Sequence, residues 1–492
     1  MASDARVTRS IPATLQRWFS RADESANMEK VDVVGTAIAK GRLKRSMKVL
    51  GTLLLTLSTS TPASSVFTVV PGLLLTSGTG AFLSMLLAAL VGLFMAFVYA
   101  ELSSAYPLAG GEYAIVGRVV GALPGFIVMG VYLVVSLLIP AVMALAIATY
   151  LGVLNPTLPT IPTAILTVAL ATLICILNIR TNAALTGVFL LVEILALSVM
   201  AGLGFFHVSR PLSDLILHPV LLSGASLVHA PIAVIGMTTS IAILAYNGFG
   251  AAVNFSEEMH EPEQHVARAI LWALAITVIA ELLPVTAVLM GVPDLKSFFR
   301  SGNMLGEFIA ARGGSALNTG ISLGVALAIF NATIAVLLVA ARVTFSTGRD
   351  RVWPRPISQA LAFTHGRFHS PWVATLLCGV LAALACLINL NLLLVLTGTG
   401  LILVYSSLCL AALIGRWGGR TAHGHYRMPW FPVAPIAALV VMVYVACTSW
   451  LDPVIGRPSL FATLGIVIAS ACYYALVLRR RGVWKLRGPQ DS

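Results

Sequence analysis

From residue 47 to residue 478 the chain alternates long apolar stretches with short polar ones. Twelve stretches approach or exceed the roughly 20 residues that an α-helix needs to cross the hydrocarbon core of a bilayer. The pattern therefore predicts an all-α membrane protein with twelve transmembrane helices. These spans are expected at 47–76, 79–104, 119–151, 160–179, 183–207, 231–256, 268–291, 317–345, 371–389, 391–414, 431–450 and 458–478.

Composition supports this reading and adds no soluble domain of useful size. The chain has 492 residues, of which 58% are hydrophobic and 10% are charged, whereas a soluble domain has about 25% charged residues. The tail 1–46 is charged and has no signal-peptide core, so the first span is expected to remain in the membrane. Within this tail, the run from Ile11 to Phe19 is interpreted either as a helix on the membrane surface or as disordered chain.

The net charge of +12 indicates membrane topology rather than nucleic-acid binding. With twelve spans, all but five of the 31 Lys and Arg residues fall on the side of the two termini. Lys and Arg are enriched in cytoplasmic loops, so both termini are expected in the cytoplasm and the protein in the cell membrane, as in a bacterial inner membrane. The five exceptions are Arg210, Lys296, Arg300, Arg312 and Arg457.

The first span has a polar core around Pro62. Proline removes an intrahelical hydrogen bond, and nearby hydroxyls can satisfy the carbonyl that it frees or can bind a ligand. The alternative is a helix kink that is packed against its neighbours. The candidate substrate-binding residues of this span are Ser60, Thr61, Ala63, Ser64 and Ser65.

The sixth span carries a second interruption, which predicts a binding site at mid-membrane. An Asn-Gly turn inside a membrane helix leaves backbone groups unpaired, and such a break is tolerated where it lines a cavity. Two broken helices five spans apart indicate an inverted repeat, 47–207 against 231–414, followed by two further spans within 431–478 and the tail 479–492. The candidate substrate-binding residues here are Tyr246, Asn247, Gly248 and Phe249.

Four groups of motifs occur along the chain. They are Val66-Phe67 with Pro71-Gly72; Glu101-Leu102 with Tyr106-Pro107 and Gly110-Gly111-Glu112-Tyr113; Gly248-Phe249 with Glu257-Glu258, Pro262 and Arg268; and Ala341-Arg342 with Gly348-Arg349-Asp350, Pro354 and Pro371. With these motifs the chain resembles the amino acid/polyamine/organocation (APC) transporter superfamily. The resemblance covers 47 to about 390 and implies the leucine-transporter fold, with a 5+5 inverted repeat plus two helices.

Two positions depart from the family pattern. Amino acid carriers of the family usually have a glycine-rich Gly-x-Gly-Ile-Phe where this chain has Ala63-Ser64-Ser65-Val66-Phe67. Fewer glycines leave backbone amides less free to surround a carboxylate, although the two serines add hydroxyl donors. The position after Gly248-Phe249, often acidic in the family, is Gly250.

Three acids inside predicted spans are candidates for coupling or gating, because a charge at bilayer depth is costly. Glu193, in the fifth span, is expected either to bind the coupling proton (in principle sodium) or to be a protonated acid that is hydrogen-bonded to a neighbouring helix. For Glu281, in the seventh span, a structural partner is the favoured interpretation. Glu101, at a helix end, is expected to pair with an arginine or with backbone amides as a gate element.

No cofactor, metal site or enzyme active site is predicted. The six cysteines lie in apolar segments without a CxxC motif and are interpreted as packing residues. His260 and His265 are separated by five positions with a proline between them, which does not fit a zinc-protease helix. Asn331, although part of an Asn-x-Thr triplet, is expected within the membrane as a cavity or packing residue. With no phosphate-binding loop, the energy source is expected to be an ion gradient or exchange.

Together these features predict a secondary active transporter, a permease that moves a small amine-bearing solute by alternating access. An amino acid is the favoured cargo and a proton the favoured coupling ion, in symport or antiport; the lipid bilayer is the other partner, and no oligomeric state is assigned. A polyamine or organocation carrier or exchanger is the first alternative. The predicted cores of spans 1, 3, 6, 8 and 10 contain no acid, which favours zwitterions over dications. A non-transporting nutrient sensor on the same fold is the second alternative.

Overall fold

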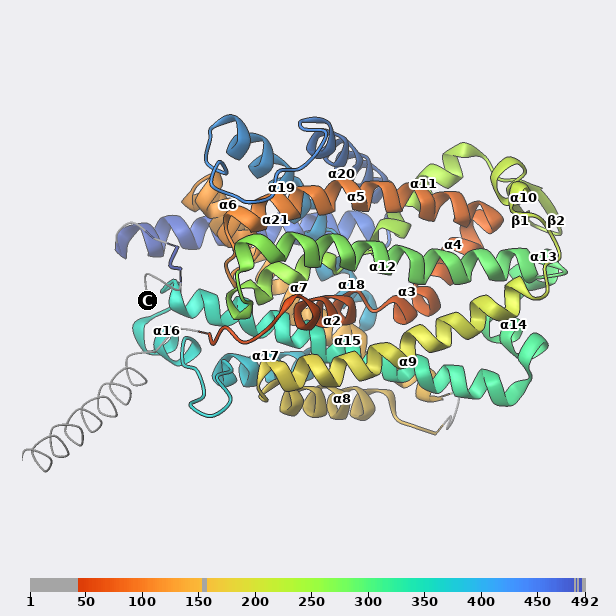
Figure 1. Ribbon diagram of the computed structural model, residues 1–492, viewed down its shortest axis with the longest axis horizontal. Coiled ribbons are helices and arrows are strands. Elements are labelled where there is room, and N and C mark those ends of the chain that lie inside the picture. The colour runs from red at the N-terminus through yellow and green to blue at the C-terminus, as the bar shows by residue number, and fades with distance from the viewer. Residues whose placement is uncertain (1–42, 153–156, 482–483, 485, 489–492) are drawn as a thin grey trace, which may run out of the picture.

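The computed structural model describes residues 43–152, 157–481, 484 and 486–488. Most of its helices run along the long axis of the molecule, and both ends of the described chain lie at one end of the bundle, the left in Figure 1. This end is called the terminal face. The short elements α10, β1, β2, α13 and α14 gather at the opposite end, called the hairpin face. The run from Ile11 to Phe19 lies outside the described residues.

The first half of the bundle contains nine helical segments, which form the first five predicted spans and the connections between them. The first span is divided into three helices that follow one another with little spacing, and a 3-10 turn joins it to the second. Its elements are α2 (Val49–Ser60), α3 (Pro62–Thr68), α4 (Val70–Ser77), η1 (Gly78–Gly80), α5 (Ala81–Ala105), α6 (Glu112–Val119), α7 (Ala122–Gly152), α8 (Thr160–Cys175) and α9 (Ile179–Phe205).

The second half begins after the loop that carries the hairpin, and its sixth span changes from an α-helix to a 3-10 helix. Its elements up to the tenth span are α10 (Leu212–Leu217), β1 (Val220–Ser223), β2 (Ser226–His229), α11 (Ile232–Ala245), η2 (Phe249–Glu258), α12 (Pro262–Gly291), α13 (Leu295–Arg300), α14 (Met304–Gly313), α15 (Ser315–Arg349), α16 (Arg355–Leu361), α17 (Trp372–Ala385), α18 (Leu390–Gly398) and α19 (Gly400–Trp417). The chain continues with α20 (Val433–Leu451), α21 (Gly456–Tyr473), the π-helical turn η3 (Tyr474–Leu478) and η4 (Arg479–Arg481).

Nine segments of the described chain are long and apolar enough to cross a membrane. The first, Val49–Ala105, has 57 residues and contains two of the predicted spans. Two shorter apolar helices, Thr160–Cys175 and Trp372–Ala385, coincide with the fourth and ninth predicted spans. The chain is therefore a helical membrane protein with helices where the hydrophobic pattern placed them. The total of twelve crossings and the inverted repeat stay predictions.

One element departs from the expected all-α fold. The strands β1 and β2 pair antiparallel, with Val220 opposite His229 and Ser223 opposite Ser226. The tip contains Gly224 at φ 59, a left-handed conformation that glycine adopts without steric cost. Val220 accepts and donates hydrogen bonds with the Thr79 hydroxyl, so the hairpin is tied to the turn between the first two spans.

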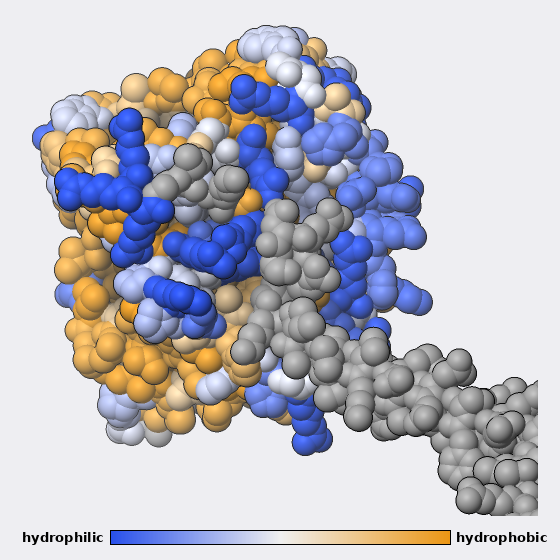
Figure 2. All heavy atoms as spheres, turned by 90° about the vertical axis from the view of Figure 1, so that its left-hand side faces the viewer, coloured by the Kyte–Doolittle hydropathy of each residue, from blue (hydrophilic) through white to orange (hydrophobic). Residues whose placement is uncertain are grey.

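Helix α15 is the most enclosed of the long helices, whereas α20 and α21 lie at the periphery. α15 packs on α7, α8, α9 and α17 and also contacts the broken first span. Figure 2 looks onto the terminal face, where hydrophilic side chains gather beside apolar flanks. Exposed cations of this face include Lys44, Arg45, Arg351 and Arg355. The core thus centres on α15, against which both broken helices can be positioned.

Candidate substrate-binding site

The first span is broken at Thr61. This residue has φ 43 and ψ 70, a left-handed conformation, and separates the end of α2 from Pro62, the first residue of α3. Proline fits the first helical position because its missing N–H would have no partner there. The five residues predicted to bind substrate in this span, Ser60, Thr61, Ala63, Ser64 and Ser65, are all buried. The break therefore lies inside the protein and not at a lipid-facing kink.

The sixth span is broken at Tyr246, Asn247 and Gly248, between α11 and η2. Gly248 has φ 115, which strongly favours glycine. The Asn247 side-chain oxygen accepts a hydrogen bond from the Gly248 N–H at 2.8 Å and from the Tyr405 hydroxyl at 2.5 Å. Tyr246 is buried and its hydroxyl has no hydrogen-bond partner within the described chain. Phe249, also buried, meets the Tyr99 ring edge-on, with 5.8 Å between centroids.

The two breaks touch one another. A Cβ added at Gly248 would lie 2.6 Å from both the Cα and the backbone nitrogen of Ser60, closer than real Cβ contacts. The Ser65 hydroxyl donates to the Ala245 carbonyl at 2.9 Å, which joins α3 to the end of α11. Ser65 and Ala245, 180 positions apart, are thus brought together where the two spans are interrupted. Helix ends of this kind present unpaired amides and carbonyls to a ligand.

Glu193 lies beside the first break. Its side chain is fully buried on α9, and Asn331 Nδ2, on α15, donates to Glu193 Oε1 at 2.9 Å and to the Ser58 hydroxyl at 3.1 Å. The carboxyl also interacts with the Thr61 hydroxyl and the Ala63 N–H, outside good hydrogen-bond geometry. Neither an arginine nor a lysine forms an ion pair with it in the described chain. Both interpretations of Glu193 keep support, since it has a neighbouring-helix hydrogen bond and also faces the break.

Glu281 lies on the other side of α3. It is fully buried on α12, near the Ser65 hydroxyl and close enough to Tyr246 for their charges to interact. Within the described residues, neither of its carboxyl oxygens has a partner at hydrogen-bond geometry. The structural interpretation favoured for this acid stays a prediction. Glu193 interacts with Ala63 and Glu281 with Ser65, so both acids lie beside the short helix α3.

Glu101 lies at the terminal face and is paired. Arg416 Nη1 is 3.2 Å from Glu101 Oε2, and the Met428 N–H donates to the same oxygen at 2.8 Å. The predicted partnership with an arginine and a backbone amide is therefore present. It joins the end of α5 to α19 and the segment that precedes α20.

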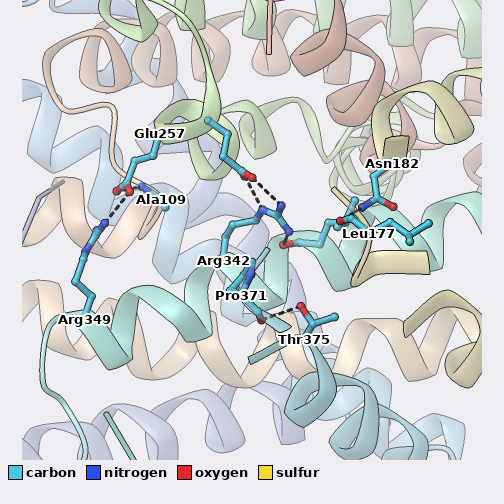
Figure 3. A network of polar contacts seen from close by, with 10 residues as sticks. Ala109, Leu177, Asn182, Glu257, Arg342, Arg349, Pro371 and Thr375 are labelled. Carbon is cyan, nitrogen blue, oxygen red and sulfur yellow. Dashed lines mark hydrogen bonds and ion pairs between the residues drawn. The ribbon is translucent and has the colours of Figure 1, made fainter. Parts of the chain in front are cut away.

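Two further ion pairs join the end of η2 to α15 (Figure 3). Arg342 binds Glu258 through two hydrogen bonds of 2.8 and 3.1 Å, and the two side chains are 0% and 2% exposed. About two turns further along α15, Arg349 contacts Glu257 at 2.6 Å. Glu257 also accepts a hydrogen bond from the Ala109 N–H at 2.8 Å. Both arginines come from α15 and both acids from the end of η2. They fix the sixth span to the core helix.

The chain before α2 also contacts the segment that follows η2. Met47 forms a parallel bridge with Met259, and the His260 N–H donates to the Met47 carbonyl at 2.9 Å. His260 thus contacts the first span through its backbone N–H. Among the described residues, no cluster of three or more His, Cys, Asp or Glu side chains could hold a metal ion.

The sequence reasoning left four residues of this region out of the site: Ser58, Asn331, Arg342 and Tyr405. Asn331 and Ser58 carried the signal of a polar residue in an apolar span. Arg342 was identified only as part of a family motif. Tyr405 gave no signal, because a tyrosine near a membrane helix is ordinary and its hydrogen bond to Asn247 depends on the packing of α19.

Comparisons with known proteins agree with this geometry. A family model described as "Amino acid permease" matches residues 48–472. The methylthioribose transporter of Bacillus subtilis is 26% identical over 412 residues, which cover 77% of this chain and 84% of that protein. The branched-chain amino acid permease BcaP of Lactococcus lactis is 23% identical over 82% of this chain and 88% of its own length. The low-affinity putrescine importer PlaP of Escherichia coli K12 is 22% identical over 69% and 75%.

These relatives are transporters, and the family model spans both breaks, both mid-bundle acids and the closing ion pairs. The protein is therefore a membrane transporter and not an enzyme, and the chain belongs to the amino acid permease family within the APC superfamily.

Proposed function

We propose that the protein is a proton-coupled carrier of a small amine-bearing solute, with an amino acid as the first candidate, and that it works by alternating access. The cargo would bind at the junction of the two broken helices. The α3 end would offer amides and hydroxyls to a carboxylate. The end of α11, with Tyr246 and Phe249, would offer carbonyls and aromatic faces to an ammonium group.

The observation that carries this proposal is the contact between Gly248 and Ser60. Two helix breaks that meet backbone to backbone in a protein interior need a reason, because each leaves polar groups that the bilayer cannot satisfy. Substrate binding at the contact supplies that reason. The relatives named above transport amino acids, a diamine or a sulfur-containing sugar according to their names, so family membership leaves the cargo open.

Proton coupling is supported by Glu193. It is buried against the first break, it has no cationic partner in the described chain, and it contacts α15 through Asn331. Acids inside membrane spans often serve as proton relays. Loading and release of this proton would change how α9 and α15 hold α3, and would thereby link the ion to the substrate site.

The terminal face is proposed to be cytoplasmic, and the described state is proposed to be closed on that side. The exposed cations of this face follow the positive-inside rule. The pairs Arg342–Glu258 and Arg349–Glu257 hold the end of η2 against α15. Opening toward the cytoplasm would require these contacts, and the bridge between Met47 and Met259, to rearrange.

A carrier of organic cations is the second candidate, and one observation favours it. Glu193 and Glu281 are both buried, both lie beside α3, and neither forms an ion pair in the described chain. A diamine could place one ammonium group near each acid. The predicted cores of spans 1, 3, 6, 8 and 10 contain no acid. Glu193 and Glu281 instead reach the site from the fifth and seventh spans.

Uptake by proteoliposomes tests the proposal. Purified protein is reconstituted, and amino acids, diamines and sugars are offered under imposed proton or sodium gradients. We expect accumulation of an amine-bearing solute that depends on the proton gradient. Binding without uptake would favour the sensor alternative, and accumulation driven only by sodium would remove the proton.

The variant Gly248→Leu tests the site itself. A side chain at this position meets Ser60 at 2.6 Å and must adopt φ 115, so we expect uptake to be abolished. Gly465→Leu is the matched control, because this helical glycine of α21 has nothing within 4 Å of its added Cβ. The control should transport normally. Wild-type uptake by folded Gly248→Leu protein would place the substrate elsewhere.

A further inference from the structure

Glu112, the acid of the Gly110-Gly111-Glu112-Tyr113 motif, is the centre of a buried cluster that the proposed mechanism does not use. It is the first residue of α6 and 3% exposed. The Tyr99 hydroxyl donates to its Oε1 at 2.9 Å, and the Tyr132 hydroxyl also interacts with the carboxyl. Within the described residues, Glu112 Oε2 has no partner that meets hydrogen-bond geometry.

The cluster continues to the break of the sixth span. The Tyr99 ring meets the Tyr405 ring edge-on, with 5.9 Å between centroids, and the Tyr405 hydroxyl donates to Asn247. On the other side, Asn254 of η2 donates to the Tyr132 hydroxyl at 3.0 Å. Tyrosines of α5, α7 and α19 thus connect one carboxyl to two points of the sixth span, Asn247 at its break and Asn254 within η2.

Two glycines allow these contacts. A Cβ at Gly111 would lie 2.5 Å from the Asn254 side-chain oxygen, and one at Gly250 would lie 2.6 Å from the Tyr99 ring. Gly250 is the position where the family often has an acid. Here a glycine lets the Tyr99 ring approach η2, and the acid of the region is supplied by α6.

Among the described residues, tyrosines surround Glu112 and no cation forms an ion pair with it. The elements packed against α6 are α7 and α19, which present Tyr132 and Tyr405 toward it. Tyr99 faces it from α5. The charged groups of the same region are engaged elsewhere: Arg416 with Glu101, Asp350 with Tyr113, and Arg118 with the Leu486 carbonyl.

The protonation state of Glu112 is therefore set by burial. Desolvation raises the pKa of Glu112 to about 7, against the lowering effect of its own backbone N–H and of the Tyr99 and Tyr132 hydroxyls. A glutamate in water has a pKa of about 4.3.

We propose that Glu112 is a second proton-binding residue of the transport cycle, which takes up a proton when the terminal side is closed and releases it when η2 moves and lets water reach the carboxyl. This proposal rests on the proposed carrier function. Glu112 would control opening toward the terminal side. Tyr99, Tyr132 and Tyr405 would couple its protonation to the position of the sixth span through their contacts with Glu112, Asn254 and Asn247.

Protonation of Glu112 and opening toward the terminal side are thermodynamically linked. Because the pKa is higher in the closed state than in an open, hydrated state, protonation favours the closed state and deprotonation favours opening. Lowering the pH on the terminal side through about 7 should therefore slow opening. In substrate exchange with the same pH on both sides, the wild-type rate should fall several-fold from about pH 8 to about pH 6.

The test compares Glu112→Gln, Tyr99→Phe and the control Glu263→Gln, an exposed acid of the same face, with side-chain exposure of 61%. Exchange is measured against pH in proteoliposomes, and protonated-carboxyl bands are followed by infrared difference spectroscopy on the purified full-length protein. Glu112→Gln should exchange slowly with a flat pH profile and should lose an infrared band that titrates near pH 7 in the wild type. Tyr99→Phe should raise the midpoint, since it removes a bond that favours the charged form.

Each outcome has one meaning. A wild-type pH profile in Glu112→Gln, or an infrared titration that this variant leaves unchanged, would overturn the proposal while leaving the carrier function intact. If no variant and no wild-type protein transports any solute, the carrier function fails, and the infrared titration still decides whether Glu112 binds a proton in this range. The Glu263→Gln control should match the wild type in both measurements.

Discussion

The buried glutamates of the described chain fall into two groups, which differ in whether an arginine neutralises them. Glu101, Glu257 and Glu258, toward the terminal face, each contact an arginine. The second group forms no ion pair within the described chain. It consists of Glu193 and Glu281, beside the broken first span, and Glu112, at the start of α6. All six are acids of low exposure, so burial alone does not distinguish them.

The difference indicates two uses for a carboxyl in a membrane protein. A buried acid with a hydrogen-bonded arginine stays charged, and the pair holds two elements together with strict geometry. A buried acid without a cation is stable only when it is protonated or when a cationic ligand approaches. The first group is suited to keeping a gate closed, and the second to binding something that comes and goes.

The largest effect is expected from breaking a paired acid. Arg342→Met leaves Glu258 buried, without a cation and without its two hydrogen bonds. Removing one partner of a buried pair costs about 3–5 kcal/mol, so we expect a clearly lower unfolding temperature in detergent and loss of transport. Thermal unfolding followed by tryptophan fluorescence measures the first, and proteoliposome uptake measures the second.

The matched control for this variant removes both charges. Arg342→Met combined with Glu258→Met should recover most of the stability, because replacing a whole buried pair by apolar side chains is often neutral or stabilising. Transport should stay impaired, since the pair can no longer break and reform as a gate. If the single variant is as stable as the wild type, the pair does not hold the closed state.

Neutralising an unpaired acid should leave stability nearly unchanged and affect coupling. Glu193→Gln keeps the size of the side chain and an oxygen for Asn331 to donate to, but it cannot titrate. With one proton per solute, each pH unit of gradient drives at most about tenfold accumulation. We expect this accumulation to disappear in the variant, while exchange of labelled for unlabelled solute continues.

The alternative interpretation of Glu193 predicts a different result. If the acid only hydrogen-bonds a neighbouring helix, Gln replaces it and accumulation stays normal. Uptake at several imposed pH gradients, with sodium absent and then present, separates the two. Normal accumulation at every gradient would move attention to Glu281, to sodium or to simple exchange.

The sequence predicted the helices and the location of the breaks better than the contacts between side chains. Apolar length alone placed the spans, because the bilayer fixes the length of a membrane helix. Pro62 and Gly248 marked the two breaks through rules of local backbone conformation. The hairpin of β1 and β2 was missed, since its strands have four residues each and lie outside the apolar spans.

The partners of the acids could not be predicted, because they depend on packing between distant helices. Asn331 is 138 positions from Glu193, and Arg342 is 84 positions from Glu258. Which face of α15 meets α9 or η2 follows from the whole bundle and not from a local pattern. The kind of partner was predicted for two acids, an arginine or backbone amides for Glu101 and, as one alternative, a neighbouring helix for Glu193, but not the residues that supply these contacts.

The smallest effect is expected from Glu281→Gln, and it separates the two candidate cargoes. Both oxygens of Glu281 lack hydrogen-bond partners in the described chain, and Ser65 and Tyr246 lie close to it. If the cargo is an amino acid and Glu281 stays protonated, Gln removes at most one neutral hydrogen bond, about 1 kcal/mol, and the KM should rise by roughly fivefold. If the cargo is a diamine held by a charged Glu281, the loss is about 1.5–3 kcal/mol and the KM should rise by more than about tenfold. Competition between an amino acid and a diamine of similar length, measured in the wild type and in Glu281→Gln, gives the ratio directly. An unchanged ratio would show that this acid does not contact the distal group of the cargo, and the contrast between paired and unpaired acids would then hold for the proton alone.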